Sequence, residues 1–402
     1  MTSEWNHFAL GEITELVIDY RGKTPKKLGG DWCKQGYRAL SAKNIKTGRI
    51  VQAETIRYID ESLYRKWMKD EVQRGDILIT SEAPFGQIFF WDSDEKIVLS
   101  QRLFCVRIKP EYDARFIYYY MTTPEFQSEL DGRATGTTVI GLRQPELMKC
   151  VIRCPEIQEQ KVIAAILSSI DAKIIANEKV NDNLEQQAQA IYHERFETVS
   201  PNDLPSDWRI VTLGEVATIS NKSFNPLKEP EILLEHYSIP AFDEARFPVF
   251  ELSTSIKSNK FIIDASCFMI SKLNPTTKRV WKPYCLTGNA VCSTEFIVYK
   301  AKDQSITDFL YSVIDSGSFS DFMCGHVTGS TGSRQRTTPS DTLSYELILP
   351  SEDELAEFQS LVSPMYAQMR INAIENDKLK RLRDSLLPKL MSGEIDVSSV
   401  HL

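Results

Sequence analysis

The chain has 402 residues with a formal net charge of −8, and 42% of them are hydrophobic. That composition predicts folded domains rather than disorder, and the length leaves room for about two to four of them. Because no apolar run has the length of a signal-peptide core or a membrane span, we expect a cytoplasmic protein with no membrane partner. The eight cysteines include no C-x-x-C pair and the five histidines are scattered, so the sequence predicts free thiols and no zinc site.

The charge is unevenly distributed along the chain. Residues 1–155 hold 23 basic and 21 acidic groups, whereas residues 156–207 hold 4 and 10. Within the first segment, residues 21–49 contain nine basic groups and a single acidic one, Asp31. Since the local field matters more than the total charge for a polyanion, the acidic total does not exclude a nucleic-acid partner.

Residues 1–154 have the pattern of a mixed α/β domain. Apolar runs predict strands at 77–79, 87–91 and 103–108, and helices are expected at 114–121 and 124–130. A turn-rich loop, Ala134 to Thr138, and a strand near 150–153 close this domain before Pro155.

Residues 155–199 predict one long helix. Its seam recurs at steps of three or four residues through Ile163, Leu167, Ile170, Ile174, Asn177, Asn181, Leu184, Ala188 and Ile191. A narrow stripe kept over about four heptads is typical of a coiled coil. At the rise of an α-helix such a segment spans about 60 Å.

The second half of the chain repeats the first. Residues 200–207 have the composition of a linker. Residues 208–349 then repeat several short sequence stretches of the first domain in the same order. The matched pairs are Leu10–Glu12 with Leu213–Glu215, Ile77–Thr80 with Phe268–Ser271, Phe104 and Val106 with Phe296 and Val298, and Thr135–Thr138 with Thr328–Thr331. We therefore predict a second domain of the same kind at residues 200–349.

Residues 350–402 repeat the long helix at an offset of 195 residues. Asn372 and Asn376 then stand where Asn177 and Asn181 stand in the first copy, and amides on a seam fix helix register because sliding leaves them unpaired. We predict that the two copies pair with each other as an antiparallel coiled coil. The expected fold is α+β, with two globular mixed domains, two long paired helices and pseudo-two-fold symmetry.

Several segments of the first half have the residue types of a DNA interface. Lysine and arginine neutralise phosphates, small hydroxyl side chains and glycines allow close approach, and Arg and Gln can read base edges. The candidates are Arg21, Lys23, Lys26, Lys27, Lys43, Lys46, Gln101, Arg102, Thr135, Thr137, Thr138, Arg143 and Gln144. A basic run is equally compatible with a solvated surface loop, and a Thr–Gly segment with an ordinary turn.

The second half offers a matching set. Its candidates are Lys272, Asn274, Lys278, Thr328, Ser330, Thr331, Arg334, Gln335 and Arg336. The Thr/Ser–Gly segment recurs just before the long helix in both halves, which favours a binding role over a simple turn.

One pattern resembles a catalytic site. Asp76, Asp94 and Lys96 have the order and spacing of a magnesium-dependent nuclease core, but Ser266 stands where Asp76 would map in the second half. Such a short pattern arises often by chance. The sequence contains no Walker-type phosphate loop, no H-E-x-x-H and no G-x-S-x-G.

An ordered set of short stretches on this duplicated frame resembles the specificity subunit of type I restriction–modification enzymes. The stretches are Arg21–Pro25, Gly75–Thr80, Val98–Gln101, Thr135–Thr138, Pro155–Gln160, Tyr237–Phe242, Thr328–Thr331 and Leu386–Leu390. The resemblance covers nearly the whole chain. The second helix departs from the family pattern, because Pro350 to Leu355 lacks the Glu-Gln pair, and this predicts a less regular helix start.

The resemblance implies a DNA reader that is not an enzyme. Its two target recognition domains, 1–154 and 200–349, would each read one half of a split, asymmetric double-stranded target, with the helices 155–199 and 350–402 acting as a ruler. Two methylation subunits using S-adenosylmethionine, and restriction/translocation subunits using ATP and magnesium, would dock on this chain, which itself would hold no cofactor. Two alternatives remain open at this stage: a self-sufficient nuclease, and a coiled-coil scaffold that binds only proteins.

Overall fold

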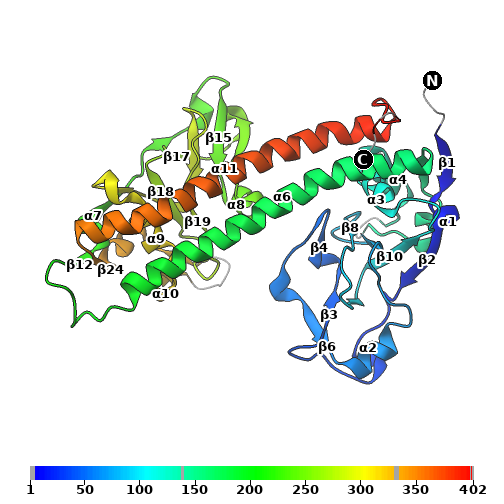
Figure 1. Cartoon of the computed structure of the whole chain (residues 1–402), viewed down its shortest axis with the longest axis horizontal. Coiled ribbons are helices and arrows are strands. Elements are labelled where there is room, and N and C mark those ends of the chain that lie inside the picture. The colour runs from blue at the N-terminus through cyan, green and yellow to red at the C-terminus, as the bar shows by residue number, and fades with distance from the viewer. Residues whose placement is uncertain (1–4, 137–139, 330–334, 399, 401–402) are drawn as a thin grey trace. The chain divides into compact units, whose positions relative to one another are not determined.

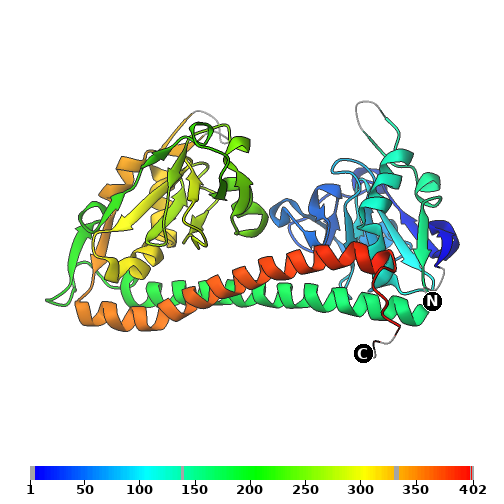
Figure 2. The same cartoon turned by 90° about the horizontal axis from the view of Figure 1, so that it is seen from above.

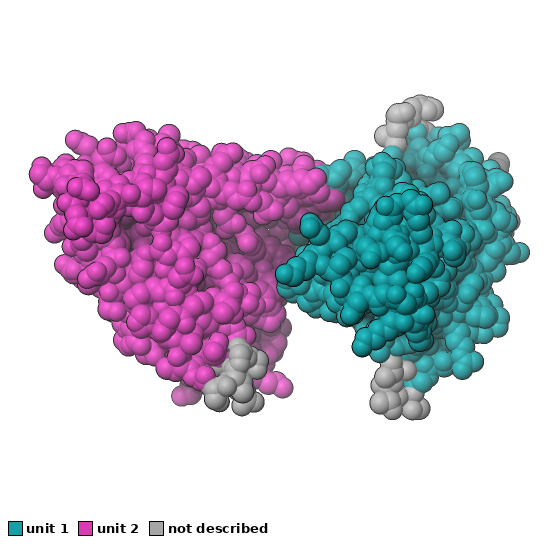
Figure 3. Space-filling model, turned by 90° about the horizontal axis from the view of Figure 1, so that it is seen from below, with its two compact units in different colours: residues 1–172, 380–402 teal, residues 173–379 magenta. Residues whose placement is uncertain are grey.

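The computed structural model describes residues 5–136, 140–329, 335–398 and 400 (Figure 1). Two long helices, α6 (Ile157–Tyr192) and α11 (Glu352–Met391), lie side by side (Figure 2). The chain divides into two compact units, unit 1 with residues 1–172 and 380–402 and unit 2 with residues 173–379 (Figure 3). Each unit therefore contains a globular part and one end of each long helix.

Unit 1 is built around a central antiparallel sheet of order β2-β10-β7-β8, flanked by smaller sheets β1-β11, β6-β3-β9 and β4-β5. Its strands are β1 (Asn6–Ala9), β2 (Thr14–Asp19), β3 (Tyr37–Leu40), β4 (Ile45–Lys46), β5 (Arg49–Ile50), β6 (Arg57–Ile59), β7 (Ile77–Thr80), β8 (Ile88–Phe90), β9 (Val98–Leu99), β10 (Leu103–Ile108) and β11 (Val151–Cys154). Its shorter helices are α1 (Leu10–Ile13), α2 (Glu61–Trp67), α3 (Ala114–Met121), α4 (Pro124–Arg133) and α5 (Gln144–Leu147), with 3-10 helices η1 (Lys26–Leu28), η2 (Ala42–Asn44) and η3 (Ala53–Thr55).

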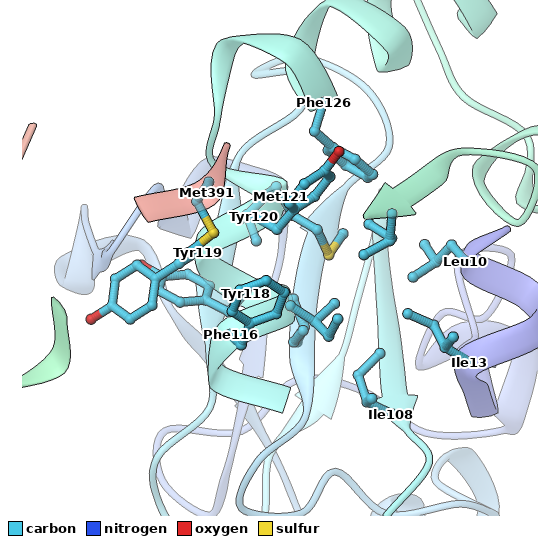
Figure 4. Close-up of a cluster of buried hydrophobic side chains, with 14 of the residues drawn as sticks. Leu10, Ile13, Ile108, Phe116, Tyr118, Tyr119, Tyr120, Met121, Phe126 and Met391 are labelled. Carbon is cyan, nitrogen blue, oxygen red and sulfur yellow. The ribbon is translucent and has the colours of Figure 1, made fainter. Parts of the chain in front are cut away.

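The central sheet of unit 1 is buried on both faces, which explains why its strands are continuous apolar runs rather than alternating ones. Phe104 and Val106 of β10 point into a core formed with α3 and the ends of the long helices, where Met391 packs (Figure 4). Leu103 and Cys105 point to the other face, into a core formed with α2, β3 and β9.

Unit 2 repeats this plan with a central sheet of order β13-β21-β18-β19, beside sheets β14-β17-β20-β15-β16, β12-β24 and β22-β23. Its strands are β12 (Arg209–Thr212), β13 (Ala217–Ile219), β14 (Ser223–Phe224), β15 (Leu233–Tyr237), β16 (Val249–Leu252), β17 (Lys260–Ile262), β18 (Cys267–Ser271), β19 (Val280–Trp281), β20 (Ala290–Ser293), β21 (Phe296–Ala301), β22 (Val327–Thr328), β23 (Arg336–Thr337) and β24 (Glu346–Leu349). Its shorter helices are α7 (Leu213–Val216), α8 (Ile239–Ala245), α9 (Thr307–Ile314) and α10 (Gly317–Gly325), with a π-helical turn η4 (His193–Glu197) after α6 and 3-10 helices η5 (Pro226–Lys228), η6 (Ser253–Ser255), η7 (Gln304–Ile306) and η9 (Pro339–Ser344).

The strand pairing corrects one correspondence between the halves. Leu103 lies opposite Thr80 in unit 1, and Phe296 lies opposite Ser271 in unit 2. Since Thr80 and Ser271 are equivalent strand ends, Leu103 matches Phe296, and the sequence match of Phe104 with Phe296 is wrong by one residue. A slip of one residue exchanges the two faces of a strand, and Phe104 and Phe296 indeed lie in cores on opposite faces.

The two long helices begin differently. In α6, the buried Gln160 donates to the carbonyl of Pro155 at 2.8 Å and accepts from the backbone N–H of Asp113 at 2.9 Å. The equivalent residue in α11 is Leu355, which is buried in the core of unit 2. The predicted irregular start is wrong: α11 is continuous from Glu352, and the Ser351 hydroxyl accepts from the Glu354 N–H at 3.4 Å.

The contacts between α6 and α11 follow an antiparallel order. In unit 2, Arg195 of η4 reaches Glu354 at 3.4 Å, whereas Asn177 donates to Asn376 at 2.8 Å. As the position moves back along the first helix from 195 to 177, its partner moves forward along α11 from 354 to 376, as the predicted fold class requires.

The predicted local elements agree with the structure to within a few residues. The helix at 114–121 and the strand at 103–108 have the predicted bounds, and the helix that begins at Pro124 extends to Arg133. The strand predicted near 150–153 is β11, whereas helix α2 and the other strands of the flanking sheets were not predicted. In the part of the chain that the structure describes, none of the helices combines the length and the apolar character that crossing a membrane needs.

Candidate DNA interface

In both units, a cluster of loops lies at one end of the strands of the central sheet. We use the word edge for this end of the sheet. In unit 1, β2 and β7 end at this edge, at Asp19 and Thr80, and β8 and β10 begin there, at Ile88 and Leu103. Because neighbouring strands are antiparallel, the loops 20–36, 81–87 and 100–102 gather at that edge. We call this cluster the unit 1 edge.

Backbone hydrogen bonds join the Thr–Gly loop to the same edge. The N–H of Ser81 donates to the carbonyl of Arg102 at 2.9 Å, and the N–H of Leu142 donates to the carbonyl of Ser81 at 2.9 Å. Thr135 and Gly141 pair with each other through two backbone hydrogen bonds of 2.9 Å. Segments that are up to 61 residues apart in the sequence therefore meet at one place.

Two of the predicted DNA-binding cations hold the first loop in position. Arg21 pairs with Asp19 at 2.8 Å, donates to the carbonyl of Leu142 at 3.2 Å and stacks over the Phe104 ring at 3.9 Å. Lys23 lies over the ring of Tyr20 at 3.7 Å and donates to a backbone carbonyl of α2, and its partial burial lowers its pKa. Both side chains make contacts within unit 1 that shape the edge.

The other predicted cations of this region are more exposed. Lys26 and Lys27 are exposed in η1, and the Lys27 ammonium donates to the carbonyl of Gly22 at 2.8 Å. Lys43 is exposed in η2, which a hydrogen bond of 3.1 Å from Ala42 to the carbonyl of Gln101 holds against the 100–102 loop. Lys46 of β4 is half-buried.

The 100–102 loop carries two exposed polar side chains, Gln101 and Arg102. Arg102 adopts a left-handed backbone conformation, with φ of 66°, and its Nε lies 2.8 Å from the Glu82 carboxylate. Arg143 is exposed and Gln144, the first residue of α5, is half-buried. The predicted contacts at Thr137 and Thr138 lie outside the described residues.

Unit 2 presents the equivalent edge, the unit 2 edge, where β18 ends at Ser271 and β21 begins at Phe296. Lys272 donates through its N–H to the carbonyl of Glu295 at 2.9 Å and accepts from the N–H of Thr337 at 3.1 Å. Asn274 donates through its N–H to the carbonyl of Gln335 at 3.0 Å. These bonds bring the predicted Lys272 and Asn274 together with residues 335–337.

Two polar side chains of the unit 2 edge are held by neighbouring groups, and a third is not. Arg336 pairs with Glu295 at 2.9 Å, which raises the pKa of the guanidinium, and the Thr328 hydroxyl donates to the Arg336 carbonyl at 3.1 Å. Asn274 has a left-handed backbone with φ of 48°, and its buried Oδ1 finds no hydrogen-bond partner among the residues that the structure describes. Ser330, Thr331 and Arg334, also predicted, lie outside those residues.

Lys278 has a different environment from the other predicted cations. Its ammonium lies 2.8 Å from the Asp315 carboxylate and donates to the Asp315 carbonyl at 2.7 Å. The Asp315 side chain is 1% exposed, and burial raises its pKa to about 6. Lys278 thus partly neutralises a buried carboxyl group at the end of α9.

The sequence did not reveal the role of the 81–87 loop. Glu82 pairs with Arg102, and the Gln87 side-chain oxygen accepts from the Thr47 N–H at 3.0 Å, so this loop connects two predicted segments of the unit 1 edge. The signal was present in the repeat, because residues 272–279 between β18 and β19 are the equivalent loop and were predicted.

The nuclease-like carboxylates are each engaged by a cation. Asp76 is 1% exposed and pairs with Arg107 at 2.9 Å, and Asp94 pairs with Arg74 at 2.9 Å. Lys96 pairs with Glu71 at 2.9 Å. Among the described residues no group of three or more His, Cys, Asp and Glu side chains has the arrangement of a metal site. The pattern that suggested a nuclease is therefore a set of ion pairs.

Comparison with known proteins identifies the family. Residues 2–186 match the model of the type I restriction modification DNA specificity domain. The MjaIX type I restriction enzyme specificity subunit of Methanocaldococcus jannaschii is 24% identical over 356 residues, which are 81% of this chain and 79% of that one. Residues 2–186 thus contain a type I DNA specificity domain, and the chain is similar to type I specificity subunits over most of its length.

Two further relatives extend this similarity. The HindI specificity subunit of Haemophilus influenzae is 22% identical over 406 residues, covering 81% of this chain and 88% of that one. The crystal structure of a type I S subunit from M. genitalium shares the fold, with a TM-score of 0.58 and 16% identity over 96% of both chains. The predicted family, the fold class and the role of a specificity subunit rather than an enzyme are confirmed.

Proposed function

We propose that this specificity subunit reads a split, asymmetric target in double-stranded DNA, one half with the unit 1 edge and the other half with the unit 2 edge. One observation supports the proposal most directly. The two units have equivalent central sheets, and the equivalent edges of these sheets carry different side chains. An equivalent frame with different polar groups is what two different half-sites require. The recognition domains of this proposal are residues 1–154 and 200–349.

Within each edge we assign different roles to the cations. The exposed Lys26, Lys27 and Lys43 have the position and exposure suited to phosphate contacts, which add affinity for any sequence. Residues anchored by backbone bonds or ion pairs, such as Gln101 and Asn274, are better placed for reading bases, because a fixed donor discriminates more sharply.

We assign the long helices to protein partners, namely two methylation subunits and, with them, restriction/translocation subunits. Two features support this: residues 156–207 are acidic, which disfavours contact with phosphates, and apolar side chains are exposed along the helices. Ile175 and Val180 of α6 are 48% and 43% exposed, and Ile371 of α11 is 56% exposed. In this proposal S-adenosylmethionine, ATP and magnesium belong to those partners.

We place this activity in the cytoplasm. All eight cysteines lie in the described part of the chain and are unpaired, and only Cys33 among them is exposed. Thiols in this state fit a reducing compartment.

The experiment that tests the proposed function is methylome sequencing of the host with and without the gene, combined with co-purification of the full chain with its candidate methylation subunits. We expect a split methylated motif that disappears when the gene is removed. A copy of the gene restored in trans should return the same motif, which controls for effects on neighbouring genes.

Two results would contradict the proposal. An unchanged methylome, together with co-purified methylation subunits, would show a scaffold without DNA reading. Magnesium-dependent cleavage by the purified chain alone, abolished by Asp94→Ala, would restore the nuclease hypothesis.

A further inference from the structure

One position in the fold carries opposite charges in the two units. Arg102 directly precedes β10 and Glu295 directly precedes β21, the central strands of the two sheets. The pairing of Leu103 with Thr80 and of Phe296 with Ser271 makes these two positions equivalent. The frame is the same, but the charge of the side chain is reversed.

In each unit this side chain forms an ion pair with a residue from another loop of the edge. Arg102 pairs with Glu82 of the β7–β8 loop at 2.8 Å, and Glu295 pairs with Arg336 of β23 at 2.9 Å. The arginine side chains are 48% and 44% exposed, and the glutamates 35% and 29%. A guanidinium–carboxylate pair is thus kept at both edges, although the arginine comes from a different segment in each.

A stabilising role does not account for this recurrence. Ion pairs this exposed contribute little, about 0–1 kcal/mol. In unit 1, Arg102 also has a left-handed backbone conformation, with φ of 66°. This conformation is energetically unfavourable for a residue other than glycine. The feature that both units retain is the chemistry presented at the sheet edge, an arginine beside a carboxylate.

This combination matches both bases of one base pair. Guanine presents two acceptors, O6 and N7, in the major groove, and arginine is their commonest specific partner. Cytosine presents an amino donor there, which a glutamate accepts. A guanidinium has five N–H groups, so one engaged with a carboxylate retains donors for a base.

We propose that the Arg102–Glu82 pair and the Arg336–Glu295 pair each read one G·C base pair, with the arginine on guanine and the glutamate on cytosine. This inference rests on the proposed function, since it assigns a base pair to each edge. The ion pair fixes the arginine before DNA arrives, which reduces the ordering cost of the contact. Because the arginine comes from different loops, the two half-sites hold their G·C pairs at different places relative to the sheet.

The first test is the motif of the unaltered subunit, assembled with its methylation partner. The methylome should show a specified G·C pair in each half-site. The second test repeats the measurement with the full-length variant Arg102→Gln, because glutamine pairs with adenine rather than guanine. We expect the preference at a single position of one half-site to change by roughly 10- to 100-fold, with the other half and the gap unaltered.

The structure offers a matched control. Arg74, which precedes β7, and Asp94, which follows β8, form an exposed ion pair of 2.9 Å at the opposite end of the strands, so Arg74→Gln should leave every position of the motif unchanged. Glu82→Gln should weaken the preference at the same position that Arg102→Gln alters, whereas Asp94→Asn should not. Arg336→Gln tests the second half independently, so poor folding of one variant does not block the test.

The outcomes separate the inference from the proposed function. Absence of any motif in the unaltered subunit refutes the proposed function. A motif lacking a specified G·C pair in either half, or an Arg102→Gln variant that weakens binding equally for all sequences, overturns this inference alone and makes Arg102 a phosphate contact.

Discussion

Asp315 shows how a single buried side chain makes stability depend on pH. It lies in unit 2 with Lys278 on the neighbouring loop, and with Glu185 of α6 and Arg246, the residue after α8, near enough to affect it. Burial raises the pKa of Asp315 from 3.8 to about 6, with a smaller contribution from Glu185, while the two cations oppose the shift. The folded protein therefore binds this proton more tightly than the unfolded chain does.

The sign of the pH dependence follows from that comparison. Between about pH 4 and pH 6 the folded state holds more protons, so the penalty for burying Asp315 increases as the pH rises through this window. Asp315→Asn removes the titrating group. We expect the free energy of unfolding of this variant, relative to the unaltered chain, to increase between pH 4 and pH 7 by up to roughly 3 kcal/mol.

Urea unfolding of both proteins at several pH values measures that difference. The exposed Asp321 of α10 is the matched control, and Asp321→Asn should show no such trend. A difference that stays constant with pH would show that Asp315 ionises in the folded protein as easily as in water.

Lys26 and Lys27 are predicted to contribute affinity without selectivity. Replacing both with glutamine should weaken DNA binding by a similar factor for target and non-target duplexes, because phosphates are the same in every sequence. The slope of log K against log salt should become shallower by up to about 2, one counterion for each lost contact. Binding titrations at several salt concentrations, on the assembled complex, measure both effects.

A lysine at the other end of the sheet provides the control. Lys109 follows β10 at the edge opposite the candidate interface and donates to the carbonyl of Glu12 at 2.7 Å, much as Lys27 donates to that of Gly22 at 2.8 Å. Lys109→Gln should leave the salt slope unchanged. A loss confined to the target sequence in the double variant would assign Lys26 and Lys27 to base reading instead.

At the scale of elements, the asparagines of the two helices meet in unit 2. Asn177 donates to Asn376 at 2.8 Å, and Asn376 donates to the carbonyl of Ile174 at 3.3 Å. Asn372 donates to Asn181 at 2.8 Å. Asn177, Asn372 and Asn376 are each about 5% exposed, so their amides depend on one another rather than on water.

A double-mutant cycle on Asn177 and Asn376 tests whether the pair fixes the register. Either single change to leucine leaves one buried amide without its partner, and should cost about 1–3 kcal/mol. The double change removes both amides, so its cost should be smaller than the sum, with a coupling energy of about 1 kcal/mol.

The register itself needs a separate measurement. A disulfide engineered across the pair in the native alignment should form cleanly in the unaltered chain, and the double leucine variant should also yield cross-links in shifted alignments. Additive single costs and an unchanged cross-link pattern would show that apolar packing alone sets the register.

The sequence predicted the elements that local pattern determines. The seam of α6, the helix α3 and the strand β10 follow from periodicity and apolar runs over consecutive residues. The register between the halves was wrong by one residue because both faces of β10 and β21 are buried, so no polar alternation marks which side chain belongs to which face.

The candidate site was predictable in composition but not in pairing. Most of its segments were found from clustered Lys, Arg, Thr and Gly residues, yet Glu82 was missed because an isolated glutamate in a turn carries no local signal. Its role comes from Arg102, 20 residues away, and that of Glu295 comes from Arg336, 41 residues away. Such contacts depend on which loops the sheet brings together, which is a property of the tertiary fold.

At the scale of the whole molecule, duplication provides the two different readers that the proposed asymmetric target requires. The two units share the order of the central sheet, the position of the loops and the attachment of a helix after the last strand. Their edges differ in which residue carries the charge. Two domains of the same architecture with different loops can thus bind different half-sites. Among the described residues, the helices α6 and α11 are the only elements that pass from one unit to the other.

This connection predicts that helix length determines the gap in the target. The paired levels Asn177–Asn376 and Asn181–Asn372 identify the matching heptads, so deleting residues 173–179 and 374–380 together removes one heptad from each helix and keeps the remaining seam aligned. Each helix becomes shorter by about 10 Å. We expect the methylated motif to keep both half-sites and to lose about three base pairs from its gap, given about 34 Å for each turn of DNA. Deleting residues 173–179 alone misaligns the seam, and should abolish the motif rather than shorten it. An unchanged gap in the double deletion, with both half-sites intact, would show that the helices do not act as a ruler and that the partner subunits set the spacing.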